Sequence, residues 1–199
     1  MSLLDMLTDQ LAGERTAQIG RQLGTDEGTA GKAIAAALPL LMGALAKNAS
    51  RGSGADSLAS ALERDHDGSV LDDLGGFLSS PDTRSGDGIL RHTLGERRGA
   101  VEQELGRRTG VDAGSIAQLL PILAPIVMGA LGKAKRQESL DTSGLVSMLS
   151  GEQRRADSMS SGTSDMLTML LDSDRDGSVA DDVAQAGIGF LGKLLRRRR

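Results

Sequence analysis

The chain reads Pro39-Leu40-Leu41-Met42-Gly43-Ala44-Leu45-Ala46-Lys47 and, 86 residues later, Pro125-Ile126-Val127-Met128-Gly129-Ala130-Leu131-Gly132-Lys133. The proline, the Met-Gly-Ala-Leu run and the lysine keep the same spacing in both copies. Apolar residues occupy nearly all sides of a helix around each run, near 27–48 and 113–135. This pattern predicts two helices at the centre of the core, and the small residues let another helix approach them closely.

Prolines interrupt the apolar runs at Pro39, Pro121 and Pro125. Proline removes a backbone donor, so we expect these residues to start, kink or interrupt their helices. The apolar stretch from Ile116 to Leu131 contains two of them and is shorter than the roughly 20 residues that span a bilayer. We therefore interpret it as a buried helix and not as a membrane span.

The composition favours helices throughout. The chain has 199 residues, enough for one or two domains with a core, and only two aromatic residues, Phe77 and Phe190. Leucine, alanine and methionine favour helices, whereas the β-branched and aromatic residues that favour strands are scarce. The predicted fold class is all-α. The chain has no cysteine, which excludes disulfides, thiolate metal sites and a cysteine nucleophile.

The charge distribution argues against a nucleic-acid partner. The net charge is −4, and the four arginines at 196–199 conceal a more acidic body. The N-terminal segment Met1–Asp9 has acids where a signal peptide needs an apolar stretch, which favours a cytoplasmic location. Export by another route stays open.

An internal duplication explains the order of the motifs. Gly24-x-Asp26-x-Gly28 matches Gly110-x-Asp112-x-Gly114 at the same offset of 86, with the aspartates placed to cap the apolar helices. Each copy is predicted to be a small helical bundle with a polar helix, the apolar helix, and an acidic loop between two short helices. The two polar helices are expected at 10–23 and 96–108. The two short helices beside the first acidic loop are expected at 58–63 and 70–78.

The expected boundaries follow from this alignment. The first repeat covers 1–80 and the second 94–195, with a linker at 81–93 and a basic tail at 196–199. The second copy has 23 extra residues, because the offset between the acidic loops is 109. These residues fall in a polar insertion at about 134–165, with a flexible stretch at Gln153–Thr163.

The acidic loops are the candidate metal sites. Asp65-His66-Asp67-Gly68-Ser69-Val70-Leu71-Asp72-Asp73 returns as Asp174-Arg175-Asp176-Gly177-Ser178-Val179-Ala180-Asp181-Asp182. Asp-x-Asp-Gly with further acids gathers oxygen ligands for a hard cation such as calcium. In the EF-hand order of the loop at 172–183, the candidate ligands are Asp172, Asp174, Asp176, the Ser178 carbonyl, and Asp181 or Asp182.

The loop at 63–74 is the weaker candidate. Its ligands would be Glu63, Asp65, Asp67, Ser69, Asp72 and Asp73, and the longer glutamate at the first position disturbs the standard geometry. Both loops lack the bidentate glutamate at the twelfth position, where Leu74 and Val183 stand. We therefore expect weak calcium binding, on the order of 10⁻⁴ M or poorer.

Helix capping is the alternative interpretation of the same residues. Ser69-x-x-Asp72 and Ser178-x-x-Asp181 fit the capping-box pattern, and acids at a helix N-terminus suit its dipole without any metal. Capping does not explain the alternation of Asp172, Asp174 and Asp176, whose charges repel unless something neutralises them.

Other parts of the chain carry weaker signals. His66 and His92 are the only histidines, and we expect both at the surface, His66 pointing to solvent. The apolar segment 187–195, followed by four arginines, could contact a membrane surface, but a packed last helix with a solvated end is favoured. No acid–base or nucleophile constellation is visible, so we do not expect an enzyme.

The runs at Leu38–Leu45 and Leu123–Leu131, with the Asp-Gly-Ser-Val-x-Asp-Asp loops, resemble the YidB-like family of bacterial proteins. The resemblance covers about 1–78 and 94–192. It implies a helical bacterial protein without an assigned activity, and it carries over no catalytic residues.

These observations predict a non-enzymatic helical protein with a structural or interaction-mediating role and one or two weak calcium-type loops. Its expected partners are a divalent cation and either another protein or a second copy of itself. The alternative is a metal-independent helical module that binds a membrane surface or a protein partner through its C-terminal tail.

Overall fold

The structure is a computed structural model that describes residues 2–159, and within this range it contains helices and no strands. This confirms the predicted all-α class. The elements in chain order are α1 (Leu3–Leu11), α2 (Glu14–Leu23), α3 (Glu27–Ala49), α4 (Gly54–Arg64), η1 (Ser69–Leu71), α5 (Leu74–Ser79), α6 (Thr83–Thr93), η2 (Gly95–Arg97), α7 (Arg98–Thr109), α8 (Ala113–Gln137) and α9 (Thr142–Met159).

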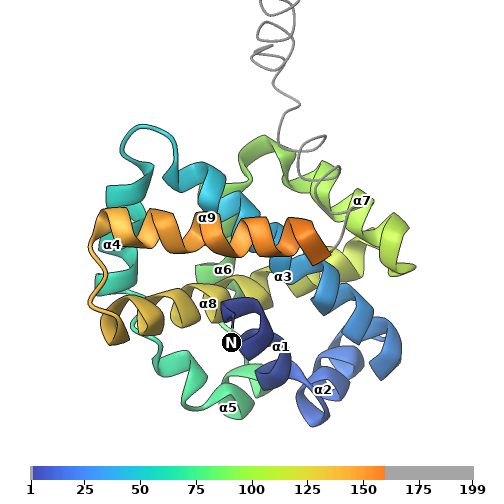
Figure 1. The fold of residues 1–199 in the computed structure, drawn as a ribbon. Coiled ribbons are helices and arrows are strands. Elements are labelled where there is room, and N and C mark those ends of the chain that lie inside the picture. Colours follow the sequence, from blue (N-terminus) through green and yellow to red (C-terminus); the bar gives the residue numbers. More distant parts are fainter. Residues whose placement is uncertain (1, 160–199) are drawn as a thin grey trace, which may run out of the picture.

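The two apolar helices, α3 and α8, form the centre of the bundle. They contact each other, and the shorter helices pack around them (Figure 1). Every residue from 119 to 132 of α8 is buried, which confirms the predicted buried helix. Both helices are long and apolar enough to cross a membrane by length and composition alone. However, 67% of the α3 window and 83% of the α8 window are buried inside the fold, as expected of core helices.

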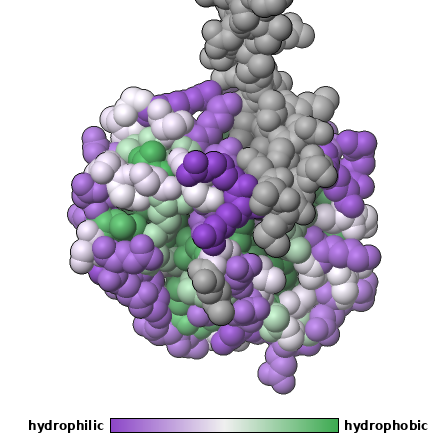
Figure 2. All heavy atoms as spheres, viewed as in Figure 1, coloured by the Kyte–Doolittle hydropathy of each residue, from purple (hydrophilic) through white to green (hydrophobic). Residues whose placement is uncertain are grey.

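Hydrophilic residues cover most of the described surface on the face seen in Figure 2, with hydrophobic residues in small patches between them. Most of the large apolar side chains are buried in the core instead. Leucines from every described α-helix join one continuous core, including Leu7, Leu23, Leu38, Leu62, Leu78, Leu90, Leu105, Leu123 and Leu145. Burial of this apolar surface is the main favourable contribution to folding.

The prolines neither start nor interrupt their helices, so those two parts of the expectation are wrong, and a kink stays a prediction. Pro39 lies inside α3, and Pro121 and Pro125 lie inside α8, and both helices are continuous. Each proline removes one backbone donor. Helical stability in a protein comes mostly from the packing of a helix against other elements. Both α3 and α8 are in contact with several other helices, so they continue through the prolines.

The predicted aspartate caps of the central helices are confirmed. Asp26 accepts a hydrogen bond from the backbone N–H of Thr29 at 2.9 Å, and Asp112 accepts one from Ser115 at 3.0 Å. Each aspartate follows a left-handed glycine that ends the preceding helix. The two hydrogen bonds hold the pKa of both carboxyls below the ordinary value of 3.8, because the hydroxyl and the backbone N–H of the capped residue favour the charged form.

Two predicted helices are divided in the structure. The expected helix over 10–23 is two helices, because Gly13, with a φ of 66°, breaks the chain between α1 and α2. Ser2 starts α1 with a capping box that it forms with Asp5. The expected helix over 70–78 is also divided, into η1 and α5, whereas the expected helix over 58–63 is the longer α4.

The segments expected to be linker and insertion are largely helical. Most of 81–93 is the helix α6, which packs against α8 so closely that a Cβ at Gly86 would collide with the carbonyl oxygen of Pro121. In the insertion, α9 continues through the stretch expected to be flexible from Gln153, as far as Met159. It packs across α3 and α4, with Leu145 and Leu149 fully buried.

The aspartate caps generate a prediction about acid stability. A depressed carboxyl pKa contributes stability that is present above the unfolded pKa and is lost as pH falls through the folded value. We expect the free energy of unfolding to fall below about pH 4. In the variant Asp26→Asn/Asp112→Asn, asparagine still caps but does not titrate, so this loss should be smaller. Urea denaturation at pH 7 and pH 3 measures the difference, and equal losses in both proteins would contradict the prediction.

Candidate functional site

The first acidic loop connects α4 to α5 and turns at a glycine. Asp65 ends α4, and Gly68 follows with a φ of 93°, a left-handed conformation that glycine adopts without strain. The single turn η1 comes next, and Asp73 caps α5 by accepting a hydrogen bond from Gly76 at 2.8 Å. The capping box suggested for Ser69 and Asp72 is not formed, because Ser69 lies in η1 and makes no side-chain cap.

Every acidic side chain proposed as a ligand in this loop has a partner within the protein. Two of them accept hydrogen bonds from nearby backbone N–H groups, and three pair with a lysine or an arginine. The contacts are Asp67 with Ser69 at 3.0 Å, Asp73 with Gly76 at 2.8 Å, Asp65 with Arg64 at 2.8 Å, Glu63 with Lys135 at 2.6 Å, and Asp72 with Lys133 at 3.2 Å.

These contacts hold two of the carboxyls in their charged form. The hydroxyl and the backbone N–H of Ser69 lower the pKa of Asp67, and the guanidinium of Arg64 lowers the pKa of Asp65. Repulsion between the acids of the loop is therefore countered by protein donors and cations. The Asp65–Arg64 and Asp72–Lys133 pairs are largely exposed, so each of these two stabilises the fold only modestly.

Within residues 2–159, no three acidic or histidine side chains are grouped so that they could hold a metal ion. In the structure, each acid proposed as a ligand in the first loop has a different protein group as its partner. The second loop, with Asp172, Asp174, Asp176, Ser178, Asp181 and Asp182, lies outside the described residues. Its calcium binding stays a prediction.

The first loop packs directly on the backbone of α8. A Cβ at Gly68 would lie 2.9 Å from the Cβ of Lys133 and 3.0 Å from the carbonyl oxygen of Gly129. A Cβ at Gly129 would collide with a methyl group of Val70, and one at Gly132 would collide with the carbonyl oxygen of His66. We call this set of close approaches the loop–α8 contact. Larger residues at these positions would force the loop away from the helix.

The small residues of the Met-Gly-Ala-Leu run therefore permit a close approach, as the sequence predicts, but the approaching element is a loop. Gly129 and Gly132 are one turn apart, on the face of α8 that receives η1. Lys133 and Lys135 come directly after Gly132 in α8. Lys133 pairs with Asp72 of the loop, and Lys135 pairs with Glu63 of α4. No role was predicted for either lysine from the sequence, although Lys133 belongs to the repeated run, and its recurrence after the Met-Gly-Ala-Leu residues is the signal that could have indicated one.

His66 is half-buried, so the expectation that it points to solvent is wrong. Burial lowers its pKa below the ordinary 6.5, and this effect outweighs the opposing charge of Asp65. His66 and the exposed His92 both line a groove of about 750 Å³ between α4 and α6. Apolar Leu45 and Met128 line the same groove, so the loop position that usually faces solvent is here part of a groove wall.

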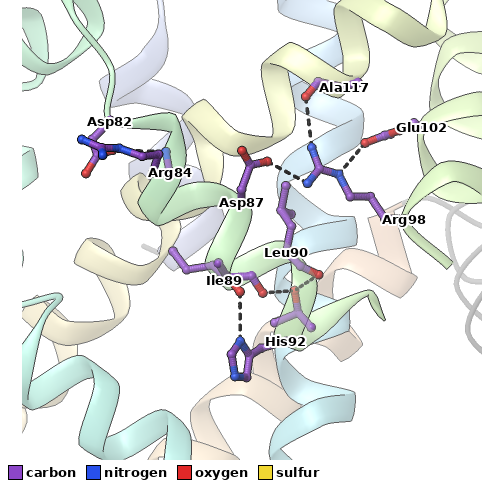
Figure 3. A network of polar contacts seen from close by, with 11 residues as sticks. Asp82, Arg84, Asp87, Ile89, Leu90, His92, Arg98, Glu102 and Ala117 are labelled. Atoms are coloured by element: carbon purple, nitrogen blue, oxygen red, sulfur yellow. Dashed lines mark hydrogen bonds and ion pairs between the residues drawn. The ribbon is translucent and has the colours of Figure 1, made fainter. Parts of the chain in front are cut away.

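A polar network fixes α6 to its neighbours (Figure 3). The guanidinium of Arg98 lies 2.7 Å from Asp87 of α6 and 2.7 Å from Glu102 of α7. It also donates a 3.5 Å hydrogen bond to the backbone carbonyl of Ala117 in α8. Because one cation joins three helices, we interpret this network as structural support for the α6 wall of the groove.

Residues 5–134 match the model of a family described as "Bacterial protein of unknown function (DUF937)". The chain belongs to this family. The match includes α3, the first acidic loop and nearly all of α8, so the loop–α8 contact lies within the family region. The YidB-like name and the EF-hand character of the loops stay predictions. No curated protein and no solved structure matches the chain.

The loop–α8 contact predicts the effect of one added methyl group. Gly132→Ala should lower the free energy of unfolding by about 1–3 kcal/mol, because the new methyl group meets the backbone carbonyl of His66. Gly151→Ala in α9 is the matched control, since nothing lies within 4 Å of its Cβ position. The control should stabilise the protein by roughly 0.5–1 kcal/mol through helix propensity. Thermal and urea denaturation measure both, and stabilisation by both substitutions would rule out the close approach.

Proposed function

We propose that this member of the family is a non-enzymatic, duplicated helical module of the cytoplasm with a structural or interaction-mediating role. In this proposal the first acidic loop joins the first half of the chain to the central helix of the second half. The observation that carries it is the loop–α8 contact, in which a loop from the first half of the chain lies on a helix from the second half.

The duplication is supported by local features that recur at an offset of 86. Gly20 and Gly106 lie against the backbone of the turn that follows their helices, where added Cβ atoms would be 3.0 Å from Thr25 O and 2.7 Å from Val111 O. The left-handed glycines and aspartate caps that come next also recur. Two segments that repeat the same helix end, turn and cap favour a common origin for the two halves.

The role of the acidic loops follows from how the first loop uses its charges. Asp73 caps α5, and Asp72 and Glu63 pair with lysines of α8, so these carboxylates order the chain through contacts with other protein groups. In the second loop, Asp172, Asp174 and Asp176 alternate as calcium ligands do. We therefore assign weak calcium binding to the second loop, where the cation would neutralise the three aspartates and order the chain.

A structural role for calcium leads to a measurable change in stability. A ligand that binds only the folded protein stabilises it by about 2.7 kcal/mol at a concentration 100 times its dissociation constant. With a dissociation constant on the order of 10⁻⁴ M, the melting temperature should rise at about 10 mM calcium and fall again with chelator.

The two loops can be separated by calorimetry. We expect calcium titration of the full chain to give weak binding heats that Asp174→Ala/Asp176→Ala abolishes. The matched variant Asp65→Ala/Asp67→Ala should retain them, because the first loop is ordered by protein partners. If the binding heats disappear only in the first-loop variant, the calcium site lies in the first loop. Blank traces for all three proteins would remove calcium from the proposal.

A further inference from the structure

The groove between α4 and α6, which we call the α4–α6 groove, has an apolar floor. Its volume of about 750 Å³ lies within the range of about 300–1,000 Å³ that is usual for small-molecule sites. Leu45 of α3, Leu58 of α4 and Met128 of α8 line the floor, and the half-buried Ile89 of α6 extends it. A hydrocarbon placed on this floor would be removed from water, which favours binding of an apolar body.

Both walls of the groove are fixed by contacts elsewhere in the fold. The guanidinium of Arg98 attaches α6 to α7 and α8, and Gly86 brings α6 close to the backbone of α8. The loop–α8 contact holds the end of α4 in the same way. A groove whose walls are already in place costs less to organise when a ligand enters.

Gly88 keeps the groove open along the α6 wall. It lines the groove, and a Cβ built on it would meet nothing within 4 Å in the described part of the chain outside its own helix. Close packing explains Gly86, whose Cβ would collide with Pro121, but it does not explain Gly88. Gly88 has the backbone of a helix, where glycine is destabilising relative to alanine. What the missing side chain provides is space in the groove.

The two walls run in opposite directions along the groove. At one end, the last residues of α4 meet the first residues of α6, because Asp65 and Ser85 line a common smaller hollow. At the other end, the start of α4 and the end of α6 meet at Asn48. Its side-chain amide donates to the carbonyl of His92 at 3.1 Å, and its own carbonyl oxygen lies against Gly54.

These two ends differ in charge. Arg64 and Arg84 line the first, which we call the arginine end, and Asp56 lines the other. Arg64 pairs with Asp65 at 2.8 Å through its Nε and Nη2 atoms. The side chain of Arg84 is 97% exposed and lies 4.0 Å from Asp82, beyond hydrogen-bond distance (Figure 3). Both guanidiniums have further N–H donors that suit a carboxylate, so the arginine end favours an anionic head.

We propose that the α4–α6 groove binds a small amphipathic carboxylate, which has one acidic head and a hydrocarbon chain. The chain lies on the apolar floor beside Gly88, and the head accepts hydrogen bonds from Arg84 and Arg64. Helices of 11 residues bound the groove on both sides and are about 16 Å long, so a medium-length chain fits between the ends. This ligand is additional to the proposed function and does not depend on calcium.

Calorimetric titration of the full-length protein with decanoate, kept below the concentration at which it forms micelles, tests the site. We expect binding at a single site, in calcium and in chelator alike. Arg84→Gln should weaken this binding about tenfold or more, because a hydrogen bond between charged groups is lost. The result expected of an unoccupied mixture of weak surface sites, a shallow titration that Arg84→Gln does not change, would contradict the proposal.

A substitution at Gly88 blocks the groove without a clash. Gly88→Leu should abolish decanoate binding, because its side chain fills the open space, and it should not lower the melting temperature, because leucine favours a helix. Gly99→Leu in α7 is the matched control. The Cβ position of Gly99 is also open, and Gly99 does not line the groove, so this variant should bind decanoate as the wild type does.

Decanedioate, which has a chain of the same length and a carboxylate at each end, tests the direction of the ligand. Its second carboxylate would lie towards Asp56, and like charges repel, so it should bind several times more weakly than decanoate. Asp56→Asn should raise the affinity for decanedioate by a larger factor than the affinity for decanoate. Equal factors would overturn the assignment of the acidic head to the arginine end.

Two results would overturn the site itself. One is the absence of decanoate binding by the wild-type protein, and the other is equal binding by Gly88→Leu and Gly99→Leu, which would place the ligand outside the groove. Blank calcium titrations together with intact decanoate binding would refute the cation proposal alone, so the two proposals fail separately.

Discussion

The close approach of a loop backbone to the backbone of α8 is the constraint on which the rest of this structure depends. Gly68, Gly129 and Gly132 leave no side chain between the two segments, so the carbonyl of His66 and the methyl groups of Val70 come to rest on the helix. Because the loop lies on α8, α4 and η1 are held against the second half of the chain. The same contact brings Lys133 within reach of Asp72.

This arrangement explains why an acidic loop can resemble a metal site and still use its charges elsewhere. A glycine that turns sharply around an ion serves equally well to bring the loop close to a helix. Asp67 stabilises the turn by accepting from Ser69, and Asp73 begins the next helix. The geometry of the first loop is therefore accounted for by backbone hydrogen bonds and lysine partners, and cation chemistry is proposed for the second loop, where three aspartates alternate.

Features set by local sequence could be predicted. The two apolar helices, the aspartate caps and the all-α class depend on periodicity and on neighbours within four residues, and these appear in the structure. Gly13, by contrast, divides a predicted helix, because one residue in a left-handed conformation outweighs the propensity of the residues around it. The segments containing α6 and α9 look polar, yet a single buried face is enough to make each of them helical.

The candidate site required contacts between residues far apart in the chain. Lys135 meets Glu63, and Lys133 meets Asp72, across more than 60 residues, and no local pattern specifies such pairs. Gly129 was expected to pack against another helix, because its spacing does not reveal which element approaches it. The half-burial of His66 has the same origin, since its neighbours come from other helices that form the groove.

A double-mutant cycle at Val70 and Gly129 tests the central claim most directly. Gly129→Ala should destabilise the protein because its new methyl group meets a Val70 methyl group, and in a Val70→Ala background that methyl group is absent. Urea denaturation of the four proteins should therefore give a coupling energy of about 1 kcal/mol or more, with the second substitution relieving the cost of the first. Additive effects would show that the loop does not lie against α8 at Gly129, and the account would fail.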